Sequence, residues 1–223
     1  MGRLLYIFSQ ICYEDVMKKK IVLALLMAAL LAGGVFADGL LSAGGGLLFD
    51  LSGNNGFKNG DAYYGMRNTS FGGYAFFDAT FVEVDVSFAR GSLTAVEEAE
   101  GVSISENFGS TMQLNVSLLG KFPIFHLLNV SLFPLIGINY NMVFSLKDPG
   151  GTSYSDPGDM SQIGILGGIG ADFGLGSSLY IRAEGMFQVR LPSKWQKDEA
   201  NYADMATTFG LGPRVKAGIG IKL

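Results

Sequence analysis

Residues 80–90 read TFVEVDVSFAR, and apolar and polar side chains alternate along this stretch. A β-strand turns successive side chains to opposite faces, so the pattern predicts a strand with one apolar face. The two-residue period does not tell which of the two faces meets water. The apolar face carries Val82, Val84, Val86 and Phe88, and the opposite face carries Glu83, Asp85, Ser87 and Ala89.

The same period recurs along the chain and predicts an all-β fold of eight strands. The predicted strands span about residues 40–51, 67–77, 79–90, 109–121, 128–144, 161–173, 179–191 and 207–223. Glycine, at 32 of 223 residues, argues against a helical bundle, because each interior glycine costs a helix about 1 kcal/mol relative to alanine.

The connections between these strands alternate in length. Those after the second, fourth and sixth strands are short, whereas the others are polar and cover residues 52–65, 91–108, 147–159 and 192–205. A soluble exported β-sandwich, the alternative fold, has no reason to collect its long loops at one end. A bacterial outer-membrane barrel has short periplasmic turns and long extracellular loops, and we therefore predict an antiparallel up-and-down transmembrane barrel of eight strands.

Composition supports a membrane environment. Hydrophobic residues make up 48% of the chain and the mean hydropathy is +0.31, which is high for an ordinary soluble domain. Charged residues make up only 16%, and the formal net charge of -4 argues against a nucleic-acid partner.

The N-terminal region has the features of an export signal. Lys18, Lys19 and Lys20 precede an apolar run that ends in small residues, so we predict a cleaved signal peptide at 17–37, with cleavage between Ala37 and Asp38. A transmembrane anchor is the less favoured interpretation. We expect residues 1–16 to be an upstream extension absent from the mature protein, and residues 38–223 to form the barrel domain.

The sequence offers little material for catalysis or metal binding. Cys12 is the single cysteine and precedes the predicted cleavage site, so the mature chain is expected to have no disulfide. His126 is the single histidine and falls in a predicted turn with no Ser or Asp partner evident nearby. We therefore expect no catalytic residues, no metal site and no cofactor, and predict that the protein is not an enzyme.

Membrane physics predicts how the sheet closes and what it encloses. Backbone groups cannot stay unpaired in hydrocarbon, so the last strand must pair with the first, with both termini on the periplasmic side. The polar faces then point inward, where opposite charges are expected to neutralise one another rather than to form an ion-selective site. The candidate lumen charges are Glu83, Asp85, Arg182, Glu184, Arg190, Arg214 and Lys216.

The mature chain resembles small bacterial outer-membrane barrels of the OmpW type and, as a second choice, of the OmpA/OmpX type. The most specific match is KAGIGIKL at 216–223, where a C-terminal assembly signal would use Lys216, Gly218, Ile221 and Leu223. The family usually ends in an aromatic residue, and this chain ends in leucine. The resemblance implies recognition by the outer-membrane assembly machinery.

The two types imply different functions. The OmpW type implies a narrow passive pore for small hydrophobic solutes, which is the function we expect first. The OmpA/OmpX type implies a barrel plugged by internal charges. The alternative function is a non-conducting surface barrel that acts as an adhesin, a host-interaction protein or a membrane-stabilising protein through its long loops, which include Trp195 and the acidic stretch 97–106. Expected partners are outer-membrane lipid, the assembly machinery and such solutes, and we expect a monomer.

Overall fold

The computed structural model describes residues 41–223, except residues 61, 80, 100–101, 128 and 204–205. The predicted extension at 1–16, the signal peptide at 17–37 and its cleavage site at Ala37 and Asp38 lie outside the described residues. Within the described part of the chain, no helix has the length and hydrophobicity that a bilayer-spanning helix needs.

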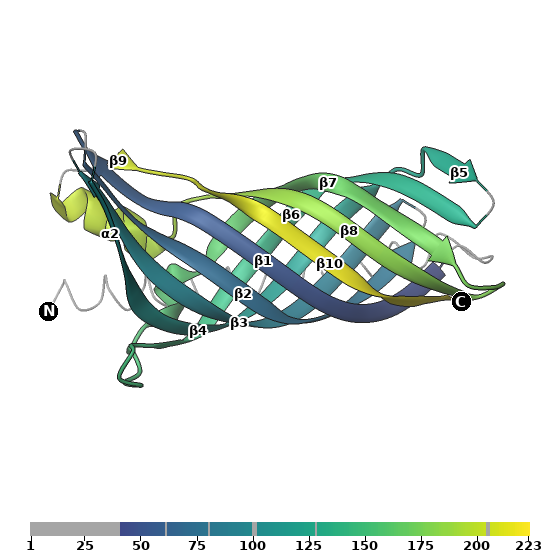
Figure 1. Cartoon of the computed structure of the whole chain (residues 1–223), viewed down its shortest axis with the longest axis horizontal. Coiled ribbons are helices and arrows are strands. Elements are labelled where there is room, and N and C mark those ends of the chain that lie inside the picture. Colours follow the sequence, from purple (N-terminus) through teal and green to yellow (C-terminus); the bar gives the residue numbers. More distant parts are fainter. Residues whose placement is uncertain (1–40, 61, 80, 100–101, 128, 204–205) are drawn as a thin grey trace, which may run out of the picture. The chain divides into compact units, whose positions relative to one another are not determined.

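Eight long strands form the body of the described structure (Figure 1). They are β1 (Leu41–Asn59), β2 (Ala62–Ala79), β3 (Val82–Ala99), β4 (Val102–Lys121), β6 (Val130–Lys147), β7 (Gln162–Gly174), β8 (Leu179–Arg190) and β10 (Gly210–Lys222). Smaller elements are the strands β5 (Phe125–Leu127) and β9 (Ala206–Thr207), the 3-10 helix η1 (Pro157–Met160) and the helix α2 (Lys194–Ala203).

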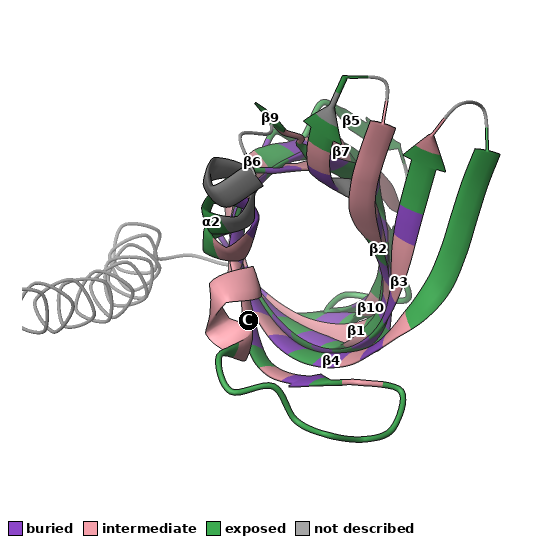
Figure 2. Cartoon of the chain, turned by 90° about the vertical axis from the view of Figure 1, so that its left-hand side faces the viewer, coloured by how far each residue is buried: buried purple, intermediate pink, exposed green. Residues whose placement is uncertain are grey.

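The long strands pair as antiparallel neighbours in the order β10-β8-β7-β6-β4-β3-β2-β1, and β1 pairs with β10. In this closing pair Gly46 lies opposite Gly218, and Asp50 lies opposite Arg214. Figure 2 shows the resulting ring of strands seen from one end. The prediction of an all-β, antiparallel, up-and-down barrel closed between its last and first strands is confirmed.

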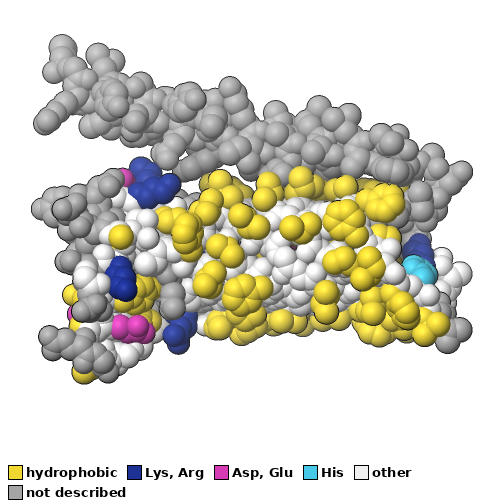
Figure 3. Space-filling view, turned by 90° about the horizontal axis from the view of Figure 1, so that it is seen from above, with side chains coloured by type: hydrophobic (Ala, Val, Ile, Leu, Met, Phe, Trp, Pro, Cys, Tyr) yellow, Lys and Arg dark blue, Asp and Glu magenta, His cyan; other side chains and the backbone are white. Residues whose placement is uncertain are grey.

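The apolar face of the wall points outward and the polar face points inward. Phe88 is 49% exposed, whereas Glu83 on the other face of β3 is 0% exposed. Figure 3 shows hydrophobic side chains spread over the middle of the barrel surface, with charged side chains near its two ends. This arrangement suits a wall surrounded by hydrocarbon, since the outward positions are those that lipid would contact.

The short connections define a turn end of the barrel, and the other connections define a loop end. At the loop end the predicted long loops at 52–65 and 91–108 are wrong. Strand β1 continues to Asn59 and β2 begins at Ala62, and likewise β3 continues to Ala99 and β4 begins at Val102. These four strands have 18 to 20 residues, whereas a tilted transmembrane strand needs about 9–11. Their paired ends at the loop end, residues 54–59, 62–66, 94–99 and 102–107, are longer than a bilayer-spanning wall requires, and we call this sheet the extension.

The predicted loop at 192–205 also contains regular structure. Helix α2 begins with a capping box, in which Gln196 N donates to Ser193 Oγ (3.2 Å) and Ser193 N donates to Gln196 Oε1 (2.9 Å). Gln162 Nε2 on β7 also donates to Gln196 Oε1 (3.0 Å), and Gln196 Nε2 donates to the carbonyl of Gly56 (3.3 Å) on β1. These bonds fasten the first turn of α2 to the rim of the barrel.

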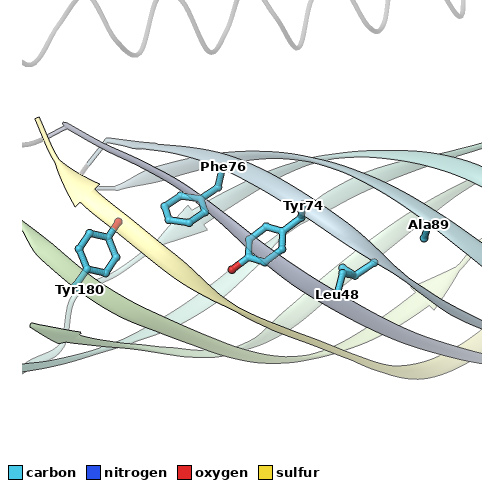
Figure 4. Packing of buried hydrophobic residues seen from close by; sticks show 5 residues of the cluster. All are labelled: Leu48, Tyr74, Phe76, Ala89 and Tyr180. Atoms are coloured by element: carbon cyan, nitrogen blue, oxygen red, sulfur yellow. The ribbon is translucent and has the colours of Figure 1, made fainter. Parts of the chain in front are cut away.

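Inside the turn end, aromatic rings lie over glycines of the neighbouring strand. The absent glycine side chain makes room for the ring, because a Cβ built on any of three glycines would lie within 2.2–2.6 Å of ring carbons. Figure 4 shows two of these rings, Phe76 and Tyr180, inside the barrel. The directly opposed pairs are Gly44 with Phe76, Gly170 with Phe133, and Gly220 with Tyr180.

Candidate functional site

The structure places all seven candidate lumen charges inside the barrel, each no more than 2% exposed. Strand β3 supplies two of them, β8 three and β10 two. Their side chains gather into two groups of ion pairs, which we call the turn-end cluster and the loop-end cluster. The turn-end cluster contains Glu83, Asp85, Arg182, Glu184 and Lys216, and the loop-end cluster contains Arg190 and Arg214.

Arg182 is the centre of the turn-end cluster. Its Nη2 donates to Asp78 (2.6 Å), its Nη1 donates to Glu83 (2.8 Å), and its Nε donates to Asp172 (2.7 Å). One guanidinium therefore joins three carboxylates from strands β2, β3 and β7. Since hydrogen bonds to charged groups are the strong ones, Arg182 ties together wall segments that are distant in the sequence.

Lysines complete the turn-end cluster. Lys216 Nζ lies 3.1 Å from Glu83 and 3.0 Å from Asp85, and it also pairs with Glu184. Lys121 pairs with Asp78, the carboxylate that Arg182 also binds. With these partners the turn-end cluster holds five carboxylates and three cations, and several members share a partner. They are Asp78, Glu83, Asp85, Asp172, Glu184, Lys121, Arg182 and Lys216.

The loop-end cluster is built around Asp50. Arg190 Nη2 and Arg214 Nη2 both donate to Asp50 Oδ2, at 2.8 and 2.7 Å, and Gln188 Nε2 donates to Oδ1 at 2.6 Å. Arg214 also reaches the side-chain oxygen of Asn115 at 3.3 Å. Amide side chains thus extend the charged pairs across the lumen.

Aromatic rings fill the space around these charges. The Arg182 guanidinium lies 4.4 Å from the ring centroid of Phe76, and the Lys121 ammonium lies 4.1 Å from that of Phe133. Eight strands enclose an interior only just wide enough for side chains to fill. The large side chains that are less than 2% exposed include Arg182, Arg214, Tyr180, Phe133, Lys216, Leu48, Leu119, Leu166, Gln113 and Gln188, so the middle of the lumen is packed.

Two hollows flank this packed middle. The hollow at the turn end has a volume of about 270 Å³ and is lined by Asp78, Lys121, Asp172 and Tyr180, among others. The cavity at the loop end has a volume of about 40 Å³, which is room for about three water molecules. Polar residues lining the smaller cavity include Asn68, Thr111, Asn141, Arg190 and Gln196.

A larger groove lies on the extension, outside the bilayer-spanning part of the wall. Its volume is about 430 Å³, and Trp195 of α2 forms one side with its ring centroid 6.0 Å from that of Phe57. Phe57 in turn stacks on Tyr64 of the neighbouring strand at 6.2 Å. Other lining residues are Met66, Ala95, Val96, Glu97, Ile104, Glu106 and Phe108. We call this surface the external groove.

Sequence reasoning missed several members of the clusters. Asp50 and Asp172 lie in predicted strands at inward positions, so the alternation could have identified them. Asp78 was expected to lie in a turn, but β2 continues to Ala79 and its carboxylate is buried. Lys121 ends β4, where the strand boundary is hardest to place from sequence.

His126 has a partner that the sequence did not reveal. Ser131 Oγ lies 2.9 Å from His126 Nε2, across the pairing between β5 and β6. Both groups are at the exposed turn end, and in the described residues no carboxylate hydrogen-bonds to the imidazole. The described residues also hold no group of three His, Cys, Asp or Glu side chains arranged for a metal ion.

The residues of the predicted assembly signal lie on β10 or directly after it. Lys216 is buried, Ile221 is outward and exposed, and Gly218 lies opposite Gly46. Leu223 N donates to the carbonyl of Leu41 at 2.9 Å, which continues the closing pair past the end of β10. The role of these residues in assembly stays a prediction.

No protein-family model matches the chain, and no curated protein matches it significantly. Solved structures do. Neisserial surface protein A is 10% identical over 82% of this chain and 97% of that one, with a TM-score of 0.49. The attachment invasion locus protein of Yersinia pestis is 18% identical over 82% and 97% (TM-score 0.42), and the outer membrane protease OmpT of Escherichia coli is 9% identical over 82% and 96% (TM-score 0.36).

The strand pairing itself makes the described part of the chain a closed, antiparallel, up-and-down β-barrel. The wall of this barrel encloses the polar network and turns apolar residues outward. We take the two end hollows as candidate sites of the lumen and the external groove as the candidate site of the extension.

Proposed function

We propose that the protein is a non-conducting barrel of the outer membrane that binds a partner at the cell surface through its extension. The observation that carries the proposal is the packed lumen, in which Arg182, Glu83 and Lys216 are 0% exposed and joined to one another by ion pairs. A solute that diffuses through the lumen would have to break these ion pairs.

The packed lumen also weighs against the pore that the OmpW resemblance implies. A path for small hydrophobic solutes needs an apolar opening, whereas the narrow middle of this barrel contains five carboxylates and three cations in mutual contact. Leaving a buried charge without its partner is strongly unfavourable, so the network resists opening. A charge-plugged interior fits the OmpA/OmpX type better.

The extension supplies the surface at which a partner would bind. We orient the barrel with the turn end and both termini in the periplasm, so that the extension and α2 face the outside of the cell. The external groove combines the rings of Phe57, Tyr64 and Trp195 with the carboxylates of Glu97 and Glu106. Aromatic faces and carboxylates together favour an extended segment with Lys or Arg next to apolar residues.

Conductance tests the first half of the proposal. The refolded protein, checked by heat-modifiable migration on a gel, would be inserted into planar bilayers and into liposomes for swelling assays. We expect no discrete conductance steps and no swelling with small sugars or hydrophobic amines. Reproducible steps at neutral pH would reject the proposal and favour the pore.

Selection from a random peptide library tests the second half. The protein embedded in nanodiscs would be panned against displayed peptides, with Trp195→Ala in parallel and Phe209→Ala as a control. Phe209 is an exposed aromatic residue that does not line the groove. We expect enrichment of basic and aromatic peptides that bind the native chain and the control but not Trp195→Ala. Peptides that bind all three alike would refute the assignment of the groove.

A further inference from the structure

A band of polar side chains crosses the outside of the wall where its apolar surface ends. On strands β2, β3, β4 and β6 the residues Thr69, Ser92, Ser110 and Lys147 lie directly opposite one another in turn. Their neighbours Thr111 and Leu146 are buried, and side chains alternate along a strand, so this row faces outward. We call it the outer polar row.

Arg90 lies one step closer to the middle of the wall than the outer polar row. It is exposed and lies between Phe71 of β2 and Met112 of β4, which are exposed as well. Phe88, the next outward residue of β3, is again apolar. Arg90 therefore stands at the boundary between the lipid-facing surface and the polar surface above it.

A groove of about 530 Å³ lies at this boundary. It is lined by Phe71, Arg90, Ser92, Ser110 and Asp148, among others. Lys147 pairs with Ser110 at its edge. The groove thus offers a guanidinium and hydroxyl groups, with an ammonium beside them, above an apolar floor.

The cations of this boundary differ from those of the lumen. Every cation of the two lumen clusters is paired with a carboxylate, whereas within the described residues Arg90 and Lys147 form no ion pair. The one acid at the groove, Asp148, accepts a hydrogen bond from Thr152 N at 2.8 Å. Positive charge is therefore available here, at the level where lipid headgroups lie.

We infer that this groove binds the phosphate of an anionic membrane lipid headgroup. The Arg90 guanidinium can hold a phosphate through two parallel hydrogen bonds, Lys147 adds a second positive charge, and Ser92 and Ser110 can donate hydroxyl hydrogens. The acyl chains then run down over Phe71 and Met112. This inference rests on the membrane location in the proposed function, but not on partner binding at the external groove, because it concerns the outer wall.

Native mass spectrometry of the detergent-solubilised protein tests the inference. Phosphatidylglycerol and phosphatidylcholine would be titrated onto the native chain and onto the double variant Arg90→Gln/Lys147→Gln. We expect preferential binding of phosphatidylglycerol and a loss of about fivefold in affinity for each cation removed. The double variant Lys194→Gln/Lys197→Gln removes the same charge from α2 and should bind within about twofold of the native chain.

Three results would overturn the inference. The first is equal binding of the two lipids, and the second is undiminished binding of phosphatidylglycerol by Arg90→Gln/Lys147→Gln. The third is displacement of the lipid by an equal concentration of inorganic phosphate, which would indicate a site for the free anion. Heat-modifiable migration confirms that each variant is folded. If the double variant does not fold, the single variants Arg90→Gln and Lys147→Gln are compared instead.

Discussion

Removing the charge of Arg182 should destabilise the barrel more than removing almost any surface charge. The substitution Arg182→Met keeps a long side chain but leaves three carboxylates, those of Asp78, Glu83 and Asp172, without the guanidinium that joins them. Arg182 and Glu83 are 0% exposed, so water replaces little of what is lost.

The expected magnitude follows from burial. Breaking a buried ion pair by removing one partner costs about 3–5 kcal/mol, because the remaining charge is left uncompensated in a medium of low polarity. Lys194 offers the matched control, since its pair with Asp159 spans 3.3 Å and the two side chains are 46% and 36% exposed. Exposed pairs contribute about 0–1 kcal/mol, so Lys194→Met should change the free energy of unfolding by no more than that.

Urea unfolding of the protein in lipid vesicles provides the measurement. The folded fraction would be followed by heat-modifiable migration on gels and by circular dichroism, for the native chain and both variants. A loss of less than about 1 kcal/mol for Arg182→Met would refute the view that the turn-end cluster holds the wall together. A loss of equal size for Lys194→Met would show that the effect of removing a cation does not depend on burial.

Three further predictions concern the wall and the extension. Val86→Arg places a charge on the outward face and should cost about 2–4 kcal/mol in vesicle unfolding, against about 0–1 kcal/mol for Ser92→Arg near the interface; equal costs would contradict the assigned boundary. Gly170→Leu should cost about 1–3 kcal/mol, because the new side chain meets the ring of Phe133, and the added substitution Phe133→Ala should recover part of that loss in the same assay. Backbone amides at 94–99 should exchange hydrogen faster than those at 82–90 of the same strand, because the extension is packed less deeply; mass spectrometry of deuterated protein that showed equal rates would argue against this.

The wall of the barrel could be predicted from the sequence because the bilayer imposes a strict pattern on it. Along 82–89 each outward residue is apolar and each inward residue meets the packed lumen, so the alternation is sharp. In the extension the alternation disappears, so the sequence predicts loops at 54–59 and 94–99 where the structure has strands. The short turns and the closing pair were predictable for the same reason that the wall was.

Side-chain partners were beyond the reach of the pattern. The alternation placed Glu83 and Arg182 on inward faces, but these two residues are 99 positions apart and their hydrogen bond depends on the register of all strands between them. Asp78 falls between the predicted strands 67–77 and 79–90, and an aspartate at such a position is typical of a turn, so its burial was not predictable. Helix α2 was missed although the sequence S-K-W-Q at 193–196 matches the capping box, since no apolar periodicity follows it.

The pairing of β1 with β10 has a consequence for how the protein folds. Ser42 lies opposite Lys222, so the first strand has to wait for the last one before its outer edge is covered. Contacts between the two ends of a chain form slowly, and an uncovered strand edge can pair with other chains in the meantime. The unfolded chain therefore passes through an interval in which it is prone to aggregate, and shielding by a chaperone during that interval should raise the yield of closed barrels.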